Sequence, residues 1–280
     1  MLRIGVAYDI LRWEERAIAD ALRRNGAEPQ LIHLRNTFIE LGRGEWPELV
    51  LQRSISHSVA SESASALESA GVTVVNGSLP ILLSNDKLLT ASILSRAGVP
   101  TPRTVAAFTP EDTLKAADTI GYPVVLKPVN GSWGRMVAKA RDEEELRALL
   151  DHRLYVPGIN SQVFLIQEYI EKPGRDIRVF VIGEDVPAAI YRVSDHWITN
   201  TARGGRAEAA EVDEELRELA IRVAEAMGAD ILGIDVFEDP RRGYVVNEVN
   251  AVPEFKNTVR ATGHPIHERI AEYAVELARR

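Results

Sequence analysis

The sequence of 280 residues contains no cysteine. Disulfides, thiolate nucleophiles and cysteine-ligated zinc or iron–sulfur clusters are therefore excluded. No apolar run approaches the roughly 20 residues that a transmembrane helix needs. The first apolar run, residues 2–8, ends at Asp9. It lacks the length and the cleavage site of a signal peptide, so it is interpreted as a strand. These absences predict a cytoplasmic protein with no membrane partner.

Basic residues are also fewer than acidic residues. The chain has 33 lysines and arginines against 41 acidic residues, a formal net charge of −8. This balance argues against a nucleic-acid partner, although a local basic site remains possible. The apolar fraction of 45% is ordinary for a chain that buries a core. The length exceeds the usual single-domain size of roughly 100–150 residues, which predicts two domains or one elaborate domain.

The first hundred residues alternate between strand and helix patterns. Strands are expected at residues 2–8, 48–52 and 72–75, and helices at 13–25 and 58–70. This rhythm predicts a parallel sheet covered by helices. The turn after the first strand has no glycine, so a dinucleotide phosphate-binding turn is absent. The sequence therefore predicts a Rossmann-like lobe with another task, within an α/β fold.

A boundary is expected near residue 100, where Gly98 is followed by two prolines. The two predicted domains are residues 1–100 and 101–280. Between 101 and about 205 the pattern predicts mainly strands. Beyond that it predicts a helix at 213–227, strands at 231–237 and 244–249, and a last helix at 266–278.

A glycine-containing loop, Gly131–Arg135, follows the apolar strand Val124–Lys127. Small residues let backbone N–H groups approach phosphate oxygens, and Lys127 would add a positive charge. The order of residues of a P-loop is absent. On these residues alone, a hairpin whose glycines only make the turn is an equally good interpretation.

Two acids and an amide lie on the last two predicted strands. Asp235 belongs to one strand, and Glu248 and Asn250, two residues apart, share a face of the next. Such oxygen ligands suit Mg²⁺. Because acids within apolar strands are costly unless compensated, a metal site is favoured over a set of salt-bridged or edge-exposed acids.

Several polar segments lie between these motifs. Arg178 and Arg192, on predicted strands, have the planar fork that binds phosphate or carboxylate, although a single arginine is more often a surface residue. The segment His196–Gly205 combines Asn200 with Arg203, either of which could bind an anionic group. His196, beside a tryptophan, is more often a packing residue than a general base.

Taken in chain order, these motifs resemble the ATP-grasp ligases. The matching residues are Asp86-Lys87, Lys127-Pro128, Gly131–Arg135, Gln167-Glu168-Tyr169, Asp176, Arg178, Asn200, Asp235, Glu248 and Asn250. The chain is similar to the ribosomal-protein-modification-like branch. Within it, the chain resembles ligases that attach an acidic amino acid to the amino-group carrier protein of lysine and arginine biosynthesis. The resemblance covers essentially the whole chain and implies a central lobe at 101–170 and a C-terminal lobe at 171–280.

The resemblance implies an ATP-dependent carboxylate–amine ligase. ATP would phosphorylate the C-terminal carboxylate of a small acidic carrier protein, and the α-amine of 2-aminoadipate would attack the acylphosphate. The implied cofactors are ATP and two Mg²⁺ ions, the latter held by Asp235, Glu248 and Asn250. The implied nucleotide-binding residues are Lys87, Lys127, Gly131, Ser132, Trp133, Gly134, Arg135, Gln167, Glu168, Tyr169, Ile170, Asp176 and Arg178. The implied catalytic residues are Arg178, Arg192, Asn200 and Arg203, and the implied substrate residues are His196, Asn200, Arg203, Gly204, Glu254 and Phe255.

The choice of amino acid is less sharply indicated. The segment His196–Gly205 and Asn257 resemble the aminoadipate-using members, whereas Val252-Pro253 resembles the glutamate-using ones. The two acids differ by one methylene, which is worth only about 1–3 kcal/mol in a pocket. Aminoadipate is expected, with glutamate or both as the alternative. Other readings are a glutamate ligase acting on a ribosomal protein tail and a non-catalytic nucleotide-binding regulator. A homodimer or homotetramer is also expected.

Overall fold

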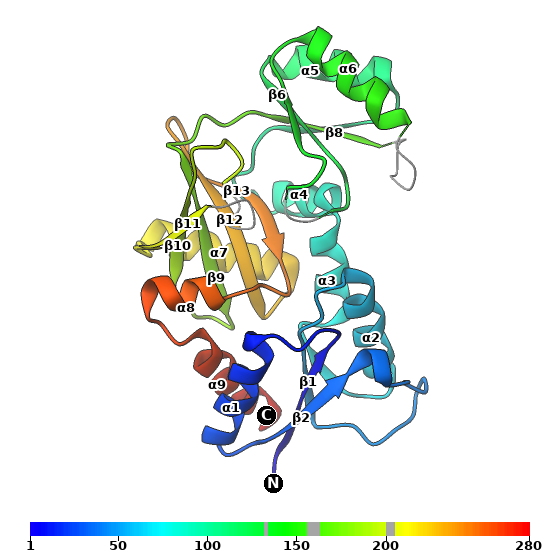
Figure 1. Ribbon diagram of the computed structural model, residues 1–280, viewed down its shortest axis with the longest axis vertical. Coiled ribbons are helices and arrows are strands. Elements are labelled where there is room, and N and C mark those ends of the chain that lie inside the picture. The colour runs from blue at the N-terminus through cyan, green and yellow to red at the C-terminus, as the bar shows by residue number, and fades with distance from the viewer. Residues whose placement is uncertain (132–133, 156–162, 200–204) are drawn as a thin grey trace.

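A computed structural model describes residues 1–131, 134–155, 163–199 and 205–280. Within these residues the chain forms three sheets, each in its own lobe. The lobe that contains β5 to β8 lies at the opposite end of the molecule from both chain termini (Figure 1). No described helix is long and apolar enough to cross a membrane.

The N-terminal sheet has the strand order β2-β1-β3-β4, and its paired strands are parallel. The predicted strand–helix rhythm is therefore confirmed. In α2, Ala60, Ala64 and Leu67 are buried at helical spacing and Ser56 caps the first turn. The elements are β1 (Arg3–Tyr8), α1 (Trp13–Arg24), β2 (Glu28–His33), the 3₁₀ turn η1 (Leu34–Asn36), β3 (Leu49–Gln52), α2 (His57–Ser69), β4 (Thr73–Val75), α3 (Ser78–Asn85) and α4 (Lys87–Arg96).

The central sheet is antiparallel, with the order β5-β8-β6-β7. Its elements are β5 (Thr104–Ala107), α5 (Pro110–Ile120), β6 (Val124–Lys127), β7 (Ala138–Ala140), α6 (Glu143–Leu154) and β8 (Phe164–Glu168). The prediction of mainly strands between 101 and 205 is wrong here, because α5 and α6 lie in this range. Thr109 caps α5 ahead of Pro110, and Asp142 caps α6. These start signals are readable in the sequence.

The C-terminal sheet has the order β11-β10-β9-β12-β13 and is antiparallel. Asp235 pairs with Glu248 and Val236 pairs with Val246, so Asn247 is the extra residue of a β-bulge. The elements are β9 (Arg175–Ile182), β10 (Ala189–Val193), β11 (Arg206–Ala210), α7 (Glu214–Met227), β12 (Ile231–Asp239), β13 (Gly243–Asn250), α8 (Lys256–Thr262) and α9 (Ile266–Ala278).

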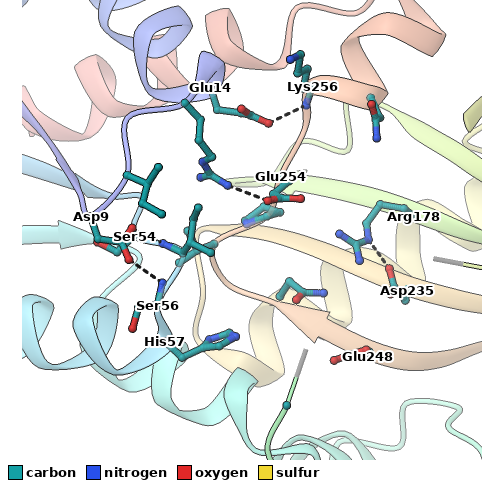
Figure 2. A pocket seen from close by; sticks show the side chains of 18 of the residues that line it. Asp9, Glu14, Ser54, Ser56, His57, Arg178, Asp235, Glu248, Glu254 and Lys256 are labelled. Atoms are coloured by element: carbon teal, nitrogen blue, oxygen red, sulfur yellow. Dashed lines mark hydrogen bonds and ion pairs between the residues drawn. The ribbon is translucent and has the colours of Figure 1, made fainter. Parts of the chain in front are cut away.

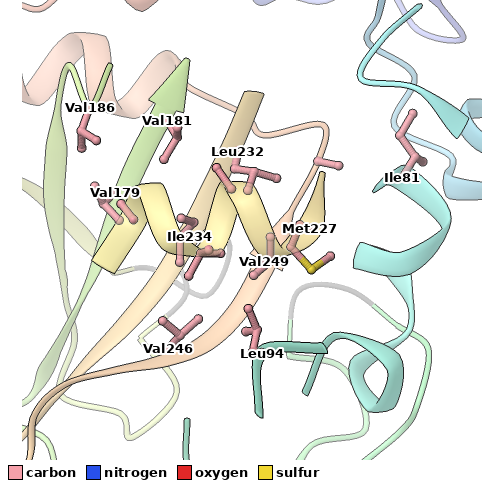
Figure 3. Close-up of a cluster of buried hydrophobic side chains, with 14 of the residues drawn as sticks. Ile81, Leu94, Val179, Val181, Val186, Met227, Leu232, Ile234, Val246 and Val249 are labelled. Atoms are coloured by element: carbon pink, nitrogen blue, oxygen red, sulfur yellow. The ribbon is translucent and has the colours of Figure 1, made fainter. Parts of the chain in front are cut away.

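Two hydrophobic cores are shared between the N-terminal and C-terminal lobes. In one, Ile81 of α3 and Leu94 of α4 join side chains of β9, β12, β13 and α7 (Figure 3). In the other, α1 packs with α9 against the ends of β1 and β9. The central lobe instead buries a core drawn from residues 107–166 alone. The first and third lobes therefore form one packed body, and the central lobe is packed separately.

Asn76, which follows β4 and is 1% exposed, ties these two lobes together. Its amide nitrogen donates to the carbonyl oxygens of Ile231 and Ala251, the latter at 2.6 Å. Its Oδ1 accepts the N–H groups of Asp230 and Ile231 at 2.8 and 3.0 Å. One amide thus satisfies four backbone groups at the junction.

Asn76→Ala is expected to lower the free energy of unfolding by about 2–4 kcal/mol, because it leaves buried backbone groups unpaired. Urea denaturation followed by circular dichroism measures the change. Asn36→Ala, at an exposed position, serves as the matched control and should unfold at the wild-type midpoint. Equal stability of the two variants would contradict the role of Asn76.

Candidate active site

Two cavities meet beside the acids of β12 and β13. The larger, of about 930 Å³, lies between the N-terminal lobe and the C-terminal sheet (Figure 2). The smaller, of about 80 Å³, lies between the central and C-terminal sheets. The residues common to both walls are Gly131, Arg135, Arg192, Asp235 and Glu248. A molecule in one cavity can therefore meet a molecule in the other at Asp235 and Glu248.

The carboxylate of Asp235 is 2% exposed and is held by two arginines. Oδ1 pairs with Arg178, and Oδ2 lies 2.8 Å from Nη2 of Arg192. Burial opposes the negative charge, but the two guanidinium groups outweigh it and hold the pKa of Asp235 below its usual value. Asp235 is therefore ionised, and the two arginines neutralise its charge within the protein.

Arg192 links two carboxylates within the protein. Its Nε donates to Oδ1 of Asp176 at 2.6 Å, and Nη2 donates to Oδ2 at 2.9 Å. Burial disfavours its charge, but Asp235 and Asp176 together raise its pKa further above the usual range. Lys172 and Thr199 also donate to Asp176. Arg192 was predicted to be catalytic and Asp176 to lie near the nucleotide; both line the smaller cavity, where they are also bound to each other.

Lys87 connects the second acid to the glycine loop. Its Nζ lies 3.2 Å from Oε1 of Glu248 and donates to the carbonyl oxygen of Gly131 at 2.5 Å. Gly131 and Gly134 have φ values of +139° and +63°, which favour glycine. Of the predicted loop, Ser132 and Trp133 lie outside the described residues.

Lys127, at the end of β6, lies in the wall of the smaller cavity. Its Nζ donates to Oδ1 of Asn247 at 2.7 Å. Burial lowers its pKa to about 8. Sequence reasoning missed Asn247, because nothing in the local pattern reveals the bulge that turns this residue toward Lys127.

The smaller cavity has an apolar wall and a polar edge, which suits a purine base. The apolar residues are Val125, Val137, Ile170, Trp197, Ile198 and Phe237. On the polar edge, Glu168 pairs with Arg242 at 2.6 Å and Gln167 donates to Thr104 at 3.0 Å. Tyr169 packs under Lys139, whose Nζ is 4.3 Å from the ring centroid.

The predicted substrate residues do not all lie at one cavity. Glu254 lines the larger cavity. Phe255 is fully buried and packs against Trp13, with ring centroids 6.0 Å apart. His196 is exposed and lines neither cavity. Asn200, Arg203 and Gly204 lie outside the described residues.

The N-terminal lobe supplies the far wall of the larger cavity, which sequence reasoning did not foresee. The lining residues from this lobe are Asp9, Ile10, Arg12, Trp13, Glu14, Arg35, Ser54, Ile55, Ser56 and His57. They come from the ends of β1, β2 and β3 and the starts of α1 and α2. The carboxyl ends of parallel strands are where α/β sheets usually bind ligands.

The oxygen atoms of Asp235, Glu248 and Asn250 suit a magnesium ion that is also bound by phosphate oxygens of a nucleotide. Among the described residues, no three His, Asp or Glu side chains form a group able to hold a metal ion. Asp235 and Glu248 face each other across β12 and β13, and Asn250 lines the same cavity. Mg²⁺ commonly takes one or two carboxylates and completes its shell with phosphate oxygens and water. The residues present therefore fit Mg²⁺ bound with a nucleotide.

Comparisons with known proteins agree with this geometry. Residues 84–274 match the RimK-like ATP-grasp domain, and residues 4–81 match the LysX preATP-grasp domain. The alpha-aminoadipate–LysW ligase LysX of Sulfurisphaera tokodaii is 44% identical over 271 residues, with 95% of each chain covered. The glutamate–LysW ligase ArgX of the same organism is 36% identical, with 98% of this chain and 99% of the relative covered.

Solved structures show the same fold. An ATP-grasp RimK domain protein from Sphaerobacter thermophilus superposes with a TM-score of 0.78 at 26% identity, covering 98% of this chain and 99% of that one. The ATP-grasp ligase PsnB, in complex with its minimal precursor, Mg and ADP, gives a TM-score of 0.75 at 20% identity, covering 99% and 98%. The second likeness concerns the fold alone.

The lowered pKa of Lys127 predicts a pH dependence. Lysine carries its positive charge below its pKa, so kcat/KM for ATP should fall as the pH rises through about 8. Lys127→Arg, which stays charged, should remove this fall. Lys127→Met should lower kcat/KM about 10- to 100-fold at pH 7, because a charged hydrogen bond is lost.

Initial rates of ADP release between pH 6.5 and 9.5 measure both effects. Lys115→Arg, an exposed lysine of α5, is the matched control and should keep the wild-type profile. The assignment of Lys127 is wrong when Lys127→Arg shows the same decline near pH 8 as the wild type.

Proposed function

The chain belongs to the RimK-like ATP-grasp family, and on that premise we propose that this ligase joins the α-amine of 2-aminoadipate to the C-terminal carboxylate of a small acidic carrier protein. The meeting of two cavities at Asp235 and Glu248 carries the proposal. A nucleotide and a carboxylate must come together at one point for phosphoryl transfer, and the wall shared by these two cavities supplies such a point. The 44% identity to a relative named for aminoadipate supports the choice of amino acid.

The nucleotide would occupy the smaller cavity, with its phosphates near the glycine loop. Gly131, Gly134 and Arg135 line it, with Lys87 and Lys127 at their side. In the structure, Lys87 pairs with Glu248 and Arg178 pairs with Asp235. A nucleotide bound with its cation can exchange these partners, because its phosphates attract the lysine and the arginine while the carboxylates turn to the metal.

Mg²⁺, when bound, neutralises the charge that develops on the phosphates during transfer. Asp235, Glu248 and Asn250 would hold it, and we assign two ions to this set. Arg192 and Asp176 would keep the carboxylate of Asp235 in place from behind, since Arg192 touches both acids.

The larger cavity would receive the carrier tail and the amino acid. Transfer of the γ-phosphoryl group to an oxygen of the tail carboxylate gives an acylphosphate and ADP. The amine then attacks the acyl carbon, and inorganic phosphate leaves as the amide forms. Glu254 and Asn250, which line this cavity, would face the substrates there. Asn200, Arg203 and Gly204 remain assigned to the substrate on the resemblance, as does His196.

The lobes are proposed at residues 1–100, 101–170 and 171–280, because each sheet falls within one of these ranges. The family resemblance supports two further proposals, a cytoplasmic location and a homodimer or homotetramer.

Glutamate is the second candidate substrate. The ArgX relative, named for glutamate, is 36% identical over nearly the whole chain. Val252-Pro253, which the resemblance associates with glutamate, lines the larger cavity. Discrimination of about 1–3 kcal/mol for one methylene allows either acid to be used at sufficient concentration.

Incubation of the enzyme with a purified carrier protein, ATP, Mg²⁺ and one amino acid tests the proposal. Intact-mass spectrometry should show the carrier gaining one aminoadipate less one water. A gain with glutamate alone would select the second candidate. A carrier unchanged by both acids, with enzyme that binds ATP, would overturn the proposed function.

Glu248→Gln should lower amide formation at least about 100-fold, because a metal-held phosphate loses several kcal/mol of stabilisation. Glu238→Gln is the matched control: Glu238 lies on β12, pairs with Arg175 and lines neither cavity. Steady-state phosphate release measures both variants. Similar losses of phosphate release in the two variants, or no loss in Glu248→Gln, would contradict the assignment of Glu248 as a metal ligand.

A further inference from the structure

The segment 251–257 forms one wall of the larger cavity and is held by the N-terminal lobe. We infer that Arg12 and Arg53 are positioning residues for the ligation, which set substrate selectivity by fixing this segment. The inference rests on the proposed function, because it concerns the same cavity. Neither arginine belongs to the ATP-binding set or to the metal set.

The segment follows β13 directly, only a few residues beyond Glu248 and Asn250. The members that line the cavity are Val252, Pro253, Glu254, Lys256 and Asn257. Any shift of this segment therefore changes the shape of the cavity next to the proposed metal ligands.

Three contacts from the N-terminal lobe fix the segment at Pro253, Glu254 and Lys256. Nη2 of Arg53 donates to the carbonyl oxygen of Pro253 at 2.8 Å. Nη1 of Arg12 pairs with Oε1 of Glu254 at 2.9 Å. Oε1 of Glu14 accepts the N–H of Lys256 at 3.3 Å, at the start of α8 (Figure 2). Each partner lies 200 or more residues away in the chain.

Phe255 attaches the segment to the core of the protein. Its ring is fully buried, packs against Trp13 and lies 5.5 Å from the guanidinium carbon of Arg53. On the other side, a Cβ added at Gly233 would come within 2.7 Å of Cβ of Pro253 and 3.3 Å of Cδ of Arg178. Pro253 thus lies between Arg53 and Gly233, and Gly233 is also in close contact with Arg178. Because Arg178 pairs with Asp235, a shift of Pro253 can reach the proposed metal ligands.

Stability does not explain why Arg53 is charged. The side chain is buried, and burial lowers its pKa to about 10, so it remains protonated at neutral pH. Its nearest carboxylate, Glu15, is 3.7 Å away, and among the described residues its Nε has no hydrogen-bond partner. Buried ion pairs of this kind contribute little net stability. The hydrogen bond to the carbonyl oxygen of Pro253 gives this buried charged side chain a role in holding the segment.

Selectivity depends on such a wall because the competing acids differ by one methylene. A displacement of about 1 Å by a distant substitution can lower the rate of the chemical step by about 100-fold. Loosening the segment should therefore lower kcat/KM for both amino acids and reduce the selectivity between them. It should leave nucleotide binding unaffected, because the proposed function assigns the nucleotide to the smaller cavity.

The test compares Arg53→Met and Arg12→Gln with the wild type. We expect kcat/KM for aminoadipate to fall about 10- to 100-fold and its ratio to that for glutamate to change at least about threefold, with KM for ATP within about twofold. Arg23→Gln, an exposed arginine of α1 paired with Asp20, is the matched control and should behave as the wild type. Proportional losses for ATP and both acids would overturn the inference.

A double-mutant cycle separates positioning from general damage. If Arg12 acts through Glu254, then Arg12→Gln should add little to the effect of Glu254→Gln. Fully additive losses would contradict this route. Arg53→Lys, which keeps a donor, should recover part of the activity lost in Arg53→Met, and no recovery would count against the hydrogen bond to Pro253.

Hydrogen–deuterium exchange of the ligand-free full chain gives a readout that is independent of turnover. Backbone amides of residues 251–257 should exchange faster in Arg53→Met and Arg12→Gln than in the wild type, while those of β6 and β8 stay unchanged. Unaltered exchange in 251–257 would overturn the inference. A wild-type enzyme that makes no amide would instead reject the proposed function, and the exchange result would still decide the positioning role.

Discussion

The carboxylate of Asp235 is the constraint around which the site is arranged. It lies within an apolar strand pair, where an unpaired charge would be too costly to bury. Arg178 and Arg192 satisfy it, and Arg192 in turn needs Asp176. Lys87 pairs with Glu248, which lies next to Asp235 on the neighbouring strand and is partly exposed. The protein thus carries, on adjacent strands, both the anions that suit a cation and the cations that suit phosphate.

The packing of the lobes explains how two cavities with different demands can share this centre. The N-terminal and C-terminal lobes share two hydrophobic cores, whereas the central lobe has its own. Most of the wall of the larger cavity belongs to the shared body, and Pro128, Asn130, Gly131, Arg135 and Met136 of the central lobe complete it. The smaller cavity lies at the junction with the central lobe, which shares no core with the other two lobes.

Local sequence patterns were sufficient for much of the framework. Val124–Lys127 and Ile266–Ala278 were predicted with the observed bounds, because an apolar run and a helical repeat are decided by neighbouring residues. The sequence placed Asp235 and Glu248 on two adjacent apolar strands, but their direct pairing depends on strand register, which only the structure shows. Helices α5 and α6 were missed although Thr109 and Asp142 mark their starts. In α5 the buried Thr113, Leu114 and Ala117 also lie at helical spacing, so this signal was readable in the sequence.

The sequence by itself determined the α/β order of elements, the family resemblance and the identity of the charged residues at the strand ends. The tertiary structure decided which of these residues face a cavity and which face each other. It buried Phe255 and Arg192, turned Asn247 inward through a bulge and joined Arg12 to Glu254 across the lobes. Such outcomes depend on contacts between distant segments and on strand register, and neither leaves a periodic signal along the chain.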